Sequence, residues 1–369
     1  MKWEGHKKAG QAKLYRCHVH ERRLKGAGSE SSRGFVRGAA GCYGHLVRTI
    51  LVFILAIGIS TATAVHGAQT NALSLTNKLS EEDLEYYKVL AEDEAASKEV
   101  DKWIRDNEAF LEKGAGQPVT LLGAKVEQRL EAVRKSYQRF LERYPNHVEG
   151  RLAYGSFLNE IHEEAAAVKE WEKAKSLDPT NPAAWNNLAN YYGHRGPVTN
   201  AFTHYEKAIS LRTNEPVYLQ NLATVVYLFR KDAKEYYKID EQQVFDKALA
   251  LYADALKLNP TNILFATALA ESYYGIKPPR YEAAIAAWND ALKLAKNDLE
   301  RQGVYIHLAR NELNSGRFDA ARQHLDLVTV PEFQEMKQRL ERNLEKKREE
   351  SAEKAKSPGS AEKPTEPKK

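Results

Sequence analysis

The sequence is poor in cysteine. Its 369 residues contain only Cys17 and Cys42, and both precede the one strongly apolar stretch of the chain. The chain after that stretch therefore has no disulfide, no reactive thiol and no cysteine-based metal site. Cys17, His18 and His20 lack the second group of ligands that a metal site needs. We expect no metal and no cofactor. The alternative of an enzyme subunit or a metal carrier rests only on these Cys and His residues.

The motifs that would indicate an enzyme are also missing. His162, Glu163 and Glu164 are followed by Ala166, where a metalloprotease helix places its second histidine. The glycines near Pro118 follow no strand pattern, so they do not form a dinucleotide-binding loop. We predict no catalytic residues and no enzymatic activity.

Basic charge is scarce outside the N-terminal region. The formal net charge is +5, but residues 1–48 hold 11 Lys or Arg against 3 Asp or Glu, and residues 49–369 hold 44 against 47. Domains that bind nucleic acid carry clustered basic charge. The nearly neutral remainder predicts no nucleic-acid partner.

Residues 49–65 carry no charge, and their strongly apolar part is 49–59. A membrane-spanning helix needs about 20 apolar residues, whereas the core of a signal peptide needs roughly 7–15. Small residues follow at 60–64. We interpret 47–65 as a signal peptide or, alternatively, an N-terminal membrane anchor. Both predict an exported chain in the periplasm or envelope, whose membrane contact is made only by this segment.

The segment 1–46 is longer than the region that precedes the apolar core of a signal peptide, and it is rich in Gly, Ser, Arg and His. No methionine lies between Met1 and Met336, and an alternative start codon at Val47 would give a compact export signal. We interpret 1–46 as a disordered leader or an untranslated stretch.

Residues 66–123 read as a polar linker followed by a capping helix. Ser80 with Asp83 three residues later resembles a capping box at the start of a helix. Apolar residues then recur at helical spacing to about 112, with a break or bend expected near 92–98. We expect this helix to cover the end of the helices that follow; a separate docking arm is the alternative.

The stretch 181–211 contains two short amphipathic helices joined by a turn. Bulky and small residues alternate at fixed offsets along them, namely Trp185, Leu188, Ala189 and Tyr192, then Ala201, Tyr205 and Ala208. This spacing resembles the tetratricopeptide repeat, with Ala189 in place of the usual glycine. The resemblance implies an all-α fold, a right-handed α-solenoid of about five to six helix pairs with helical caps.

The same pattern recurs along 124–331. One position late in each second helix, which is Ala in four of the six, recurs at intervals of 34, 34, 47, 36 and 37 residues. It is occupied by Phe140, Ala174, Ala208, Ala255, Ala291 and Val328. The longest interval contains an insertion at 230–243, which predicts a longer helix pair or a lateral docking surface. Small residues let paired helices approach and aromatic residues fill the space beside them. The predicted core also includes Trp171, Leu222, Ala223, Leu269, Ala270, Trp288, Leu308 and Ala309.

The resemblance also implies where a partner binds, since in this family the first helix of each pair lines a concave groove. The residues at the groove positions here are Asn186, Asn187, Asn190, Gln220, Asn221, Thr224, Glu271, His307 and Arg310. Side-chain amides carry a donor and an acceptor together, so an Asn/Gln row can pair with the backbone of an extended peptide. The alternative is that these amides solvate the groove or brace neighbouring helices.

The C-terminal region is highly charged. Residues 332–350 predict a helix that uses a narrow apolar stripe to cap the array, and 351–369 is a Lys/Glu/Pro-rich tail expected to be disordered. Together these patterns predict a scaffold that binds a protein or peptide segment in its groove. A membrane-tethered assembly factor that uses the N-terminal helix and the C-terminal helix is the alternative.

Overall fold

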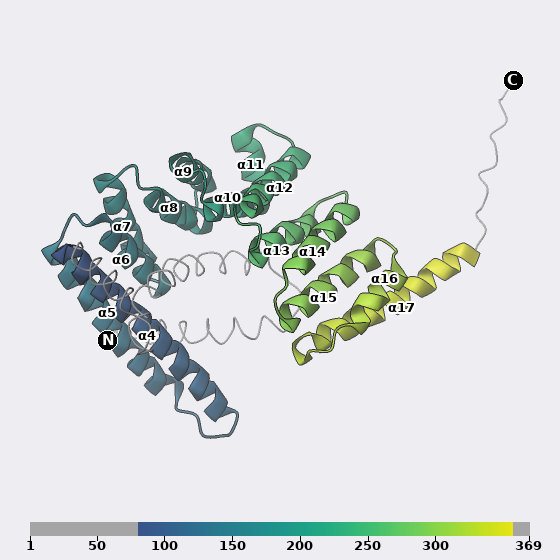
Figure 1. Cartoon of the computed structure of the whole chain (residues 1–369), viewed down its shortest axis with the longest axis horizontal. Coiled ribbons are helices and arrows are strands. Elements are labelled where there is room, and N and C mark those ends of the chain that lie inside the picture. Colours follow the sequence, from purple (N-terminus) through teal and green to yellow (C-terminus); the bar gives the residue numbers. More distant parts are fainter. Residues whose placement is uncertain (1–79, 357–369) are drawn as a thin grey trace, which may run out of the picture. The chain divides into compact units, whose positions relative to one another are not determined.

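The computed structural model describes residues 80–356, and every regular element in that range is helical (Figure 1). The chain divides into two compact units, Met1–Ala248 (unit 1) and Leu249–Lys369 (unit 2), which are treated separately below. No helix within 80–356 is long and apolar enough to cross a membrane. The predicted leader 1–46, the apolar segment 47–65, the linker up to residue 79 and the tail from residue 357 lie outside the described residues.

Unit 1 is built from successive helix pairs. Neighbouring helices in the chain pack on each other: α4 on α5, α6 on α7, and α8 on α9, with α7 and α9 contacting the pair that follows. The helices are α4 (Glu81–Leu111), α5 (Val119–Arg143), α6 (Val148–Glu160), α7 (Glu164–Leu177), α8 (Pro182–Arg195), α9 (Val198–Leu211), α10 (Pro216–Leu228), α11 (Arg230–Tyr237) and the first part of α12 (Glu241–Leu258).

The first helix, α4, is continuous across 92–98, so the weaker apolar pattern there does not break it. It begins with the predicted capping box, in which Ser80 accepts a hydrogen bond from the backbone of Asp83 and the Asp83 carboxylate accepts one from the Ser80 backbone. Buried Asp93 explains the continuity, because its carboxylate accepts a 2.7 Å hydrogen bond from the Tyr137 hydroxyl of α5. The polar stretch of α4 therefore faces a partner on α5, and α4 packs as half of a hairpin.

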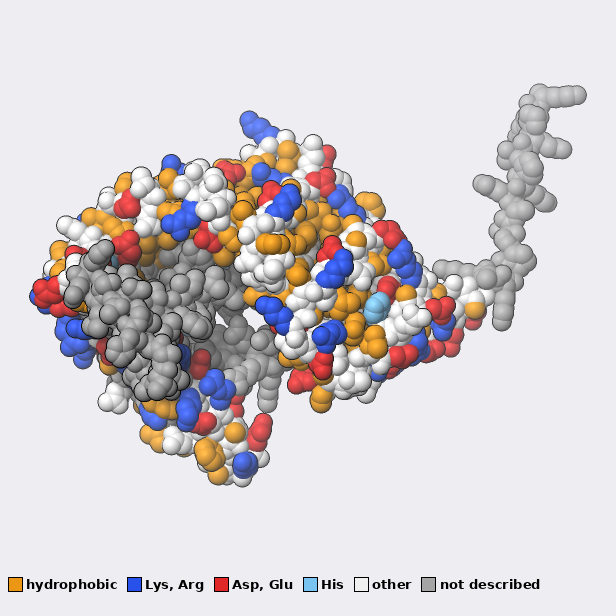
Figure 2. All heavy atoms as spheres, viewed as in Figure 1, with side chains coloured by type: hydrophobic (Ala, Val, Ile, Leu, Met, Phe, Trp, Pro, Cys, Tyr) orange, Lys and Arg blue, Asp and Glu red, His pale blue; other side chains and the backbone are white. Residues whose placement is uncertain are grey.

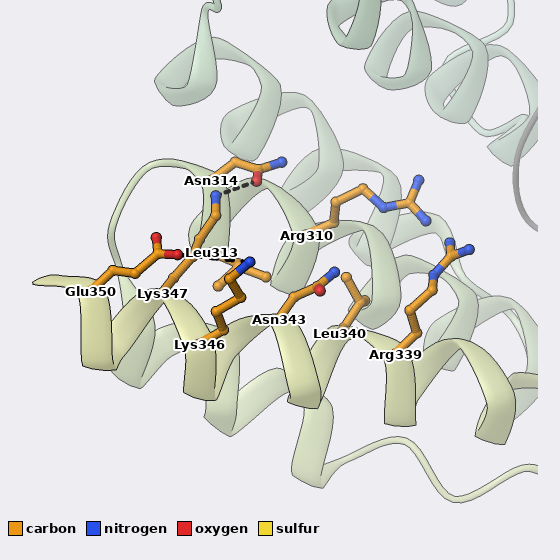
Figure 3. A pocket seen from close by; sticks show the side chains of 9 residues that line it. All are labelled: Arg310, Leu313, Asn314, Arg339, Leu340, Asn343, Lys346, Lys347 and Glu350. Atoms are coloured by element: carbon orange, nitrogen blue, oxygen red, sulfur yellow. Dashed lines mark hydrogen bonds and ion pairs between the residues drawn. The ribbon is translucent and has the colours of Figure 1, made fainter.

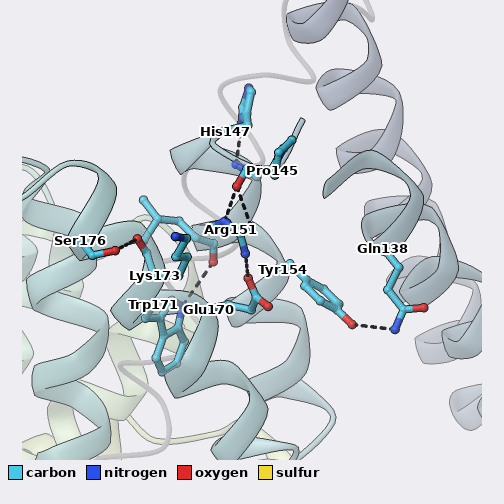
Figure 4. Close-up of polar contacts among 11 residues, drawn as sticks. Gln138, Pro145, His147, Arg151, Tyr154, Glu170, Trp171, Lys173 and Ser176 are labelled. Carbon is cyan, nitrogen blue, oxygen red and sulfur yellow. Dashed lines mark hydrogen bonds and ion pairs between the residues drawn. The ribbon is translucent and has the colours of Figure 1, made fainter. Parts of the chain in front are cut away.

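The pair of α6 and α7 shows how a small residue sets the helix separation. The Trp171 indole N–H donates to the Leu152 carbonyl at 3.3 Å, and a Cβ on Gly155 would lie 2.4 Å from the Trp171 Nε1 (Figure 4). Only glycine admits this approach at position 155. On the same helix pair, the Arg151 guanidinium forms a 2.6 Å ion pair with Glu170.

Asparagine starts several of the first helices. The Asn181 side chain accepts a hydrogen bond from the Ala183 backbone at 3.0 Å, with Pro182 in the first turn of α8. Asn262 and Asn297 cap α13 and α15 in the same way. These caps satisfy backbone N–H groups that the first turn leaves unpaired, so the helix starts are set locally.

The insertion at 230–243 forms the short helix α11. Tyr236 and Tyr237 pack against Phe202 of α9, with ring centroids 5.1 and 5.5 Å away. The Tyr236 hydroxyl also donates to the Glu206 carboxylate at 3.0 Å. The two tyrosines therefore attach α11 to the preceding helix pair.

Unit 2 repeats the pairing and ends in a cap. Its helices after α12 are α13 (Ile263–Ser272), η1 (Tyr273–Gly275), α14 (Tyr281–Leu294), α15 (Asp298–Asn314), α16 (Phe318–Asp326), η2 (Pro331–Phe333) and α17 (Gln334–Lys356). Leu340 and Leu344 of α17 are buried against the α15–α16 pair, and Phe333 and Met336 pack at the edge of that cluster. The apolar stripe of the charged C-terminal helix thus covers the last pair.

The predicted core residues are placed as follows. Buried residues are Trp171, Leu188, Ala189, Ala201, Tyr205, Ala208, Leu222, Ala223, Ala270, Trp288, Leu308 and Ala309. Trp185, Tyr192 and Leu269 are only partly buried, and Tyr192 packs against the edge of the buried cluster. Trp185 lies at the edge because its indole N–H donates to the Pro179 carbonyl in the preceding turn, at 2.9 Å. The described helices form the tetratricopeptide-type pairs that the spacing predicts.

Candidate functional site

The predicted amide row lies on the first helices of unit 1, and part of it is buried. Asn186 of α8 and Asn221 of α10 are 0% and 5% exposed. The Asn221 Nδ2 donates to the Asn186 Oδ1 at 3.1 Å. Thr224 is also buried, and its hydroxyl donates to the Gln220 carbonyl one turn earlier at 2.9 Å. The expected open position is therefore wrong for these three side chains. The two amides join α10 to α8, whereas the Thr224 hydroxyl bonds within α10.

The other predicted groove residues of unit 1 are partly exposed. Asn187, Asn190 and Gln220 lie on the same two helices and keep part of their surface open to solvent. The Asn190 Oδ1 accepts a 2.5 Å hydrogen bond from the Tyr205 hydroxyl, which fixes the orientation of that amide. Burial raises the pKa of Tyr205 far above its ordinary value, so its hydroxyl remains a donor. Asn187 and Gln220 are the amides with room for a partner.

In unit 2, the predicted residues Glu271, His307 and Arg310 gather around Tyr274. The Tyr274 hydroxyl lies 2.8 Å from the His307 Nδ1 and accepts a 3.1 Å hydrogen bond from the Asn311 Nδ2. The Arg310 guanidinium lies 5.5 Å from the centre of the Tyr274 ring. Residues from α13, η1 and α15 thus form one connected polar surface, named here the Tyr274 cluster: Glu271, Tyr274, His307, Arg310 and Asn311.

The Tyr274 cluster was only partly predictable. Tyr274 follows α13 on a short 3-10 turn, so helical spacing does not place it on the face of the first helix. Its ring is 40% exposed, the highest exposure in the cluster. No motif in the sequence marked it.

Burial controls the charges of the cluster. It lowers the pKa of His307 to about 3, with a smaller contribution from the positive charge of Arg310, so the imidazole is neutral near pH 7. It raises the pKa of Tyr274 to about 12. The tyrosine hydroxyl and the neutral imidazole are therefore joined by a hydrogen bond whose donor is set by the tautomer of His307. The imidazole also stacks on the Trp288 indole, with centroids 4.1 Å apart and planes inclined by 4°.

Glu271 and Arg310 carry the ionisable charge of the cluster. Desolvation raises the pKa of the Glu271 carboxyl to about 7, and the Arg310 charge opposes this shift. Arg310 reaches the Met336 sulfur at 3.7 Å, and no carboxylate within the described part of the chain lies in salt-bridge distance of it. A cation with this freedom can pair with an incoming carboxylate or carbonyl.

Within residues 80–356, no group of three His, Cys, Asp or Glu side chains is placed to hold a metal ion. The leader residues Cys17, His18 and His20 lie outside this range.

Comparisons with known proteins give matches among solved structures. No protein-family model matches the sequence, and no curated protein sequence matches it significantly. Among solved structures, the chain is similar to YrrB, a TPR protein described as having an unusual peptide-binding site, with 13% identity over 57% of this chain and 99% of that one and a TM-score of 0.43. It is also similar to PilF of Pseudomonas aeruginosa, with 15% identity over 66% and 99% and a TM-score of 0.43. A thermophilic TPR protein of Thermus thermophilus, TTC0263, matches with 20% identity over 53% and 98% and a TM-score of 0.39. These likenesses concern the fold alone.

Proposed function

We propose that this chain is a non-enzymatic interaction scaffold that binds a protein or peptide segment along the first helices of its helix pairs. Helix pairs of this kind bury their apolar faces against one another and leave one helix of each pair available to a partner. In unit 1 this surface offers the amides of Asn187 and Gln220. In unit 2 it offers the Tyr274 cluster.

The observation that carries this proposal is that the Arg310 guanidinium lies over the ring of Tyr274. The guanidinium lies against an exposed aromatic ring, and its charge lowers the raised pKa of the neighbouring Glu271 carboxyl. Tyrosine and arginine supply much of the energy at protein interfaces, because they combine large contact area with directed hydrogen bonds. The hydrogen bonds of Tyr274 with Asn311 and His307 hold its ring in place before a partner arrives, which lowers the entropic cost of binding.

The test compares Arg310 with a matched arginine on the same helix. Arg310→Ala and Arg301→Ala remove the same charge from α15, but Arg301 is 39% exposed and pairs with Asp298 one turn away. Both tagged proteins are used for capture from the native cell envelope. The proposal requires that Arg310→Ala reduces the yield of a co-purifying protein while Arg301→Ala does not. Equal yields from both variants would remove the Tyr274 cluster from the binding surface.

Export to the envelope is part of the same proposal, and the apolar segment 49–65 supports it. N-terminal sequencing of the mature protein distinguishes its two forms, because a signal peptide is cleaved near residue 64 and an anchor is retained. A mature protein that begins at Met1 and is found in the cytoplasmic fraction would contradict export.

A second candidate function, an assembly factor, is favoured by the tip of the α4–α5 hairpin. Three large apolar side chains are exposed there: Phe110 by 54%, Leu111 by 47% and Leu121 by 57%. Exposed apolar groups that gather at one place indicate a contact surface. Phe110→Ser with Leu121→Ser should then dissolve a native complex without changing the unfolding temperature. An intact complex would exclude the tip as its contact.

A further inference from the structure

A pocket of about 540 Å³ lies between α15 and α17 in unit 2. Its walls come from the last turns of α15 and from one side of α17 (Figure 3). The apolar part is formed by Leu313 and Leu340, both nearly buried. The pocket therefore has an apolar floor and a rim of long polar side chains.

The rim is strongly basic. Arg310, Arg339, Lys346 and Lys347 contribute four positive charges, and Glu350 contributes the one negative charge. The surrounding chain is different, because residues 249–356 contain 17 Lys or Arg and 16 Asp or Glu. Positive charge is thus concentrated at the pocket within a nearly neutral unit.

This concentration arises from how α17 distributes its charges. Arg322 of α16 pairs with Glu345 and lies 3.8 Å from Glu341, and Arg348 pairs with Asp319 of α16. Two acidic side chains of α17, Glu341 and Glu345, are therefore held toward α16. Arg339, Lys346 and Lys347 line the pocket on the α15 side together with Glu350.

The two lysines of the rim keep donors for an anion. The Lys346 side chain is 76% exposed, and its nearest carboxylate, Glu350, lies 3.9 Å away, at the limit of an ion pair. The Lys347 ammonium donates to the neutral Asn314 amide oxygen at 2.9 Å and keeps further donors (Figure 3). Arg310 and Arg339 line the other end of the pocket, one from each helix (Figure 3).

We propose that this pocket binds an acidic, extended segment of a partner protein. The rise of α17 separates Arg339 from Lys346 by roughly 11 Å, which an extended peptide spans in about three to four residues. Carboxylates at alternate positions of such a peptide would face the rim, and its backbone would lie over Leu313 and Leu340. Arginine pairs with carboxylates in a bidentate geometry, which suits the end that holds Arg310 and Arg339.

The shape and charge favour an acidic peptide over other polyanions. Nucleic acids and anionic membranes are bound by broad basic surfaces. Lys and Arg side chains are interspersed with Asp and Glu on the face shown in Figure 2, and the net charge of unit 2 is small. An open basic pocket with an apolar floor between two helices fits a single peptide strand.

The test measures binding of a fluorescent peptide of alternating aspartate and serine to the purified full chain by fluorescence anisotropy. Binding should saturate, weaken as salt is added and be absent for the same peptide with asparagine in place of aspartate. Lys346→Glu should weaken it by roughly three- to tenfold, since one exposed ion pair is replaced by a repulsion. This pocket shares only Arg310 with the Tyr274 cluster, so Lys346 tests it independently of the proposed function.

The matched control is Lys293→Glu on α14. Lys293 is 73% exposed and pairs with Asp290 one turn away, so the substitution makes the same change of charge at similar exposure. Its affinity for the peptide should equal that of the unchanged protein. Equal losses from Lys346→Glu and Lys293→Glu would overturn the proposal, and so would binding of a single-stranded oligonucleotide or of anionic vesicles in preference to the peptide.

Discussion

Asn221 of α10 donates a hydrogen bond from its side-chain amide to the Asn186 Oδ1 of α8, at 3.1 Å and out of contact with water. The two residues lie on first helices of successive pairs. A buried polar group that is paired stabilises the fold modestly, but one left unpaired costs more. The amide pair therefore fixes the alignment of two repeats, while neighbouring Asn187 remains partly open.

Removing one member of this pair should destabilise the fold. Asn221→Ala leaves the Asn186 amide buried without its partner, so we expect a loss of about 1–3 kcal/mol in the free energy of unfolding. Asn187→Ala should change that free energy by less than about 0.5 kcal/mol, because Asn187 is partly solvated. Urea denaturation followed by circular dichroism measures both. A small effect of Asn221→Ala would show that the pair does not brace the helices.

Gly155 tests the close approach of α6 and α7. A methyl group at this position would meet the Trp171 indole at 2.4 Å, so Gly155→Ala should cost about 1–3 kcal/mol through overpacking. Gly123 lies inside α5 with no atom within 4 Å of such a methyl group, and there the same substitution should stabilise by about 0.5–1 kcal/mol. Thermal unfolding distinguishes the two signs. Two shifts of the same sign would contradict the packing described here.

The buried carboxyl of Glu271 predicts that the stability of the fold falls as the pH rises towards neutral. Its pKa rises from 4.5 to about 7 on folding, so the folded chain holds a proton that the unfolded chain releases between these values. Stability is therefore lost as the pH rises from 4.5 through 7. Glu271→Gln removes this loss and should be more stable than the original protein above pH 7, by roughly 1–3 kcal/mol, with no advantage below pH 4.5. A difference that is constant with pH would exclude the buried carboxyl as its cause.

The buried imidazole of His307 predicts the opposite effect, a loss of stability as the pH falls. Its pKa falls from 6.5 to about 3 on folding, so the unfolded chain takes up a proton that the folded chain excludes. Stability is therefore lost as the pH falls from 6.5 towards 3. His307→Phe keeps a flat ring against Trp288 and should reduce this acid slope by at most about 1.4 kcal/mol per pH unit. Denaturation at several pH values measures it, and an unchanged slope would assign the acid loss to other groups.

Much of the fold follows from residue spacing. Alternating bulky and small residues at 181–211 locate α8 and α9, and asparagine with proline locates the start of α8. The partner of α5 was not recognised from spacing, because α4 is long and carries polar residues such as Asp93 on its packed face. Its place in a hairpin is set by long-range contacts, among them the hydrogen bond between Asp93 and Tyr137 and the packing of Ile104 against Val126.

The candidate site is less accessible to sequence reasoning. Helical geometry places Asn186 and Asn187 on the first helix, but it does not tell which amide lies between neighbouring helices and which faces solvent. The separation of α8 and α10 decides this, and it depends on packing across the repeats. Tyr274 escapes the pattern for a different reason, since it follows the end of α13 on a turn.

Site-specific photo-crosslinking in living cells tests most directly whether the first helices bind the partner. A photoreactive amino acid is placed at Asn187, Gln220 and Tyr274, and at exposed positions Lys173, Lys207 and Lys293 of second helices as controls. The proposed function predicts a crosslink to the same protein from the first set and none from the second. Crosslinks confined to the second helices, or equal from both sets, would contradict it.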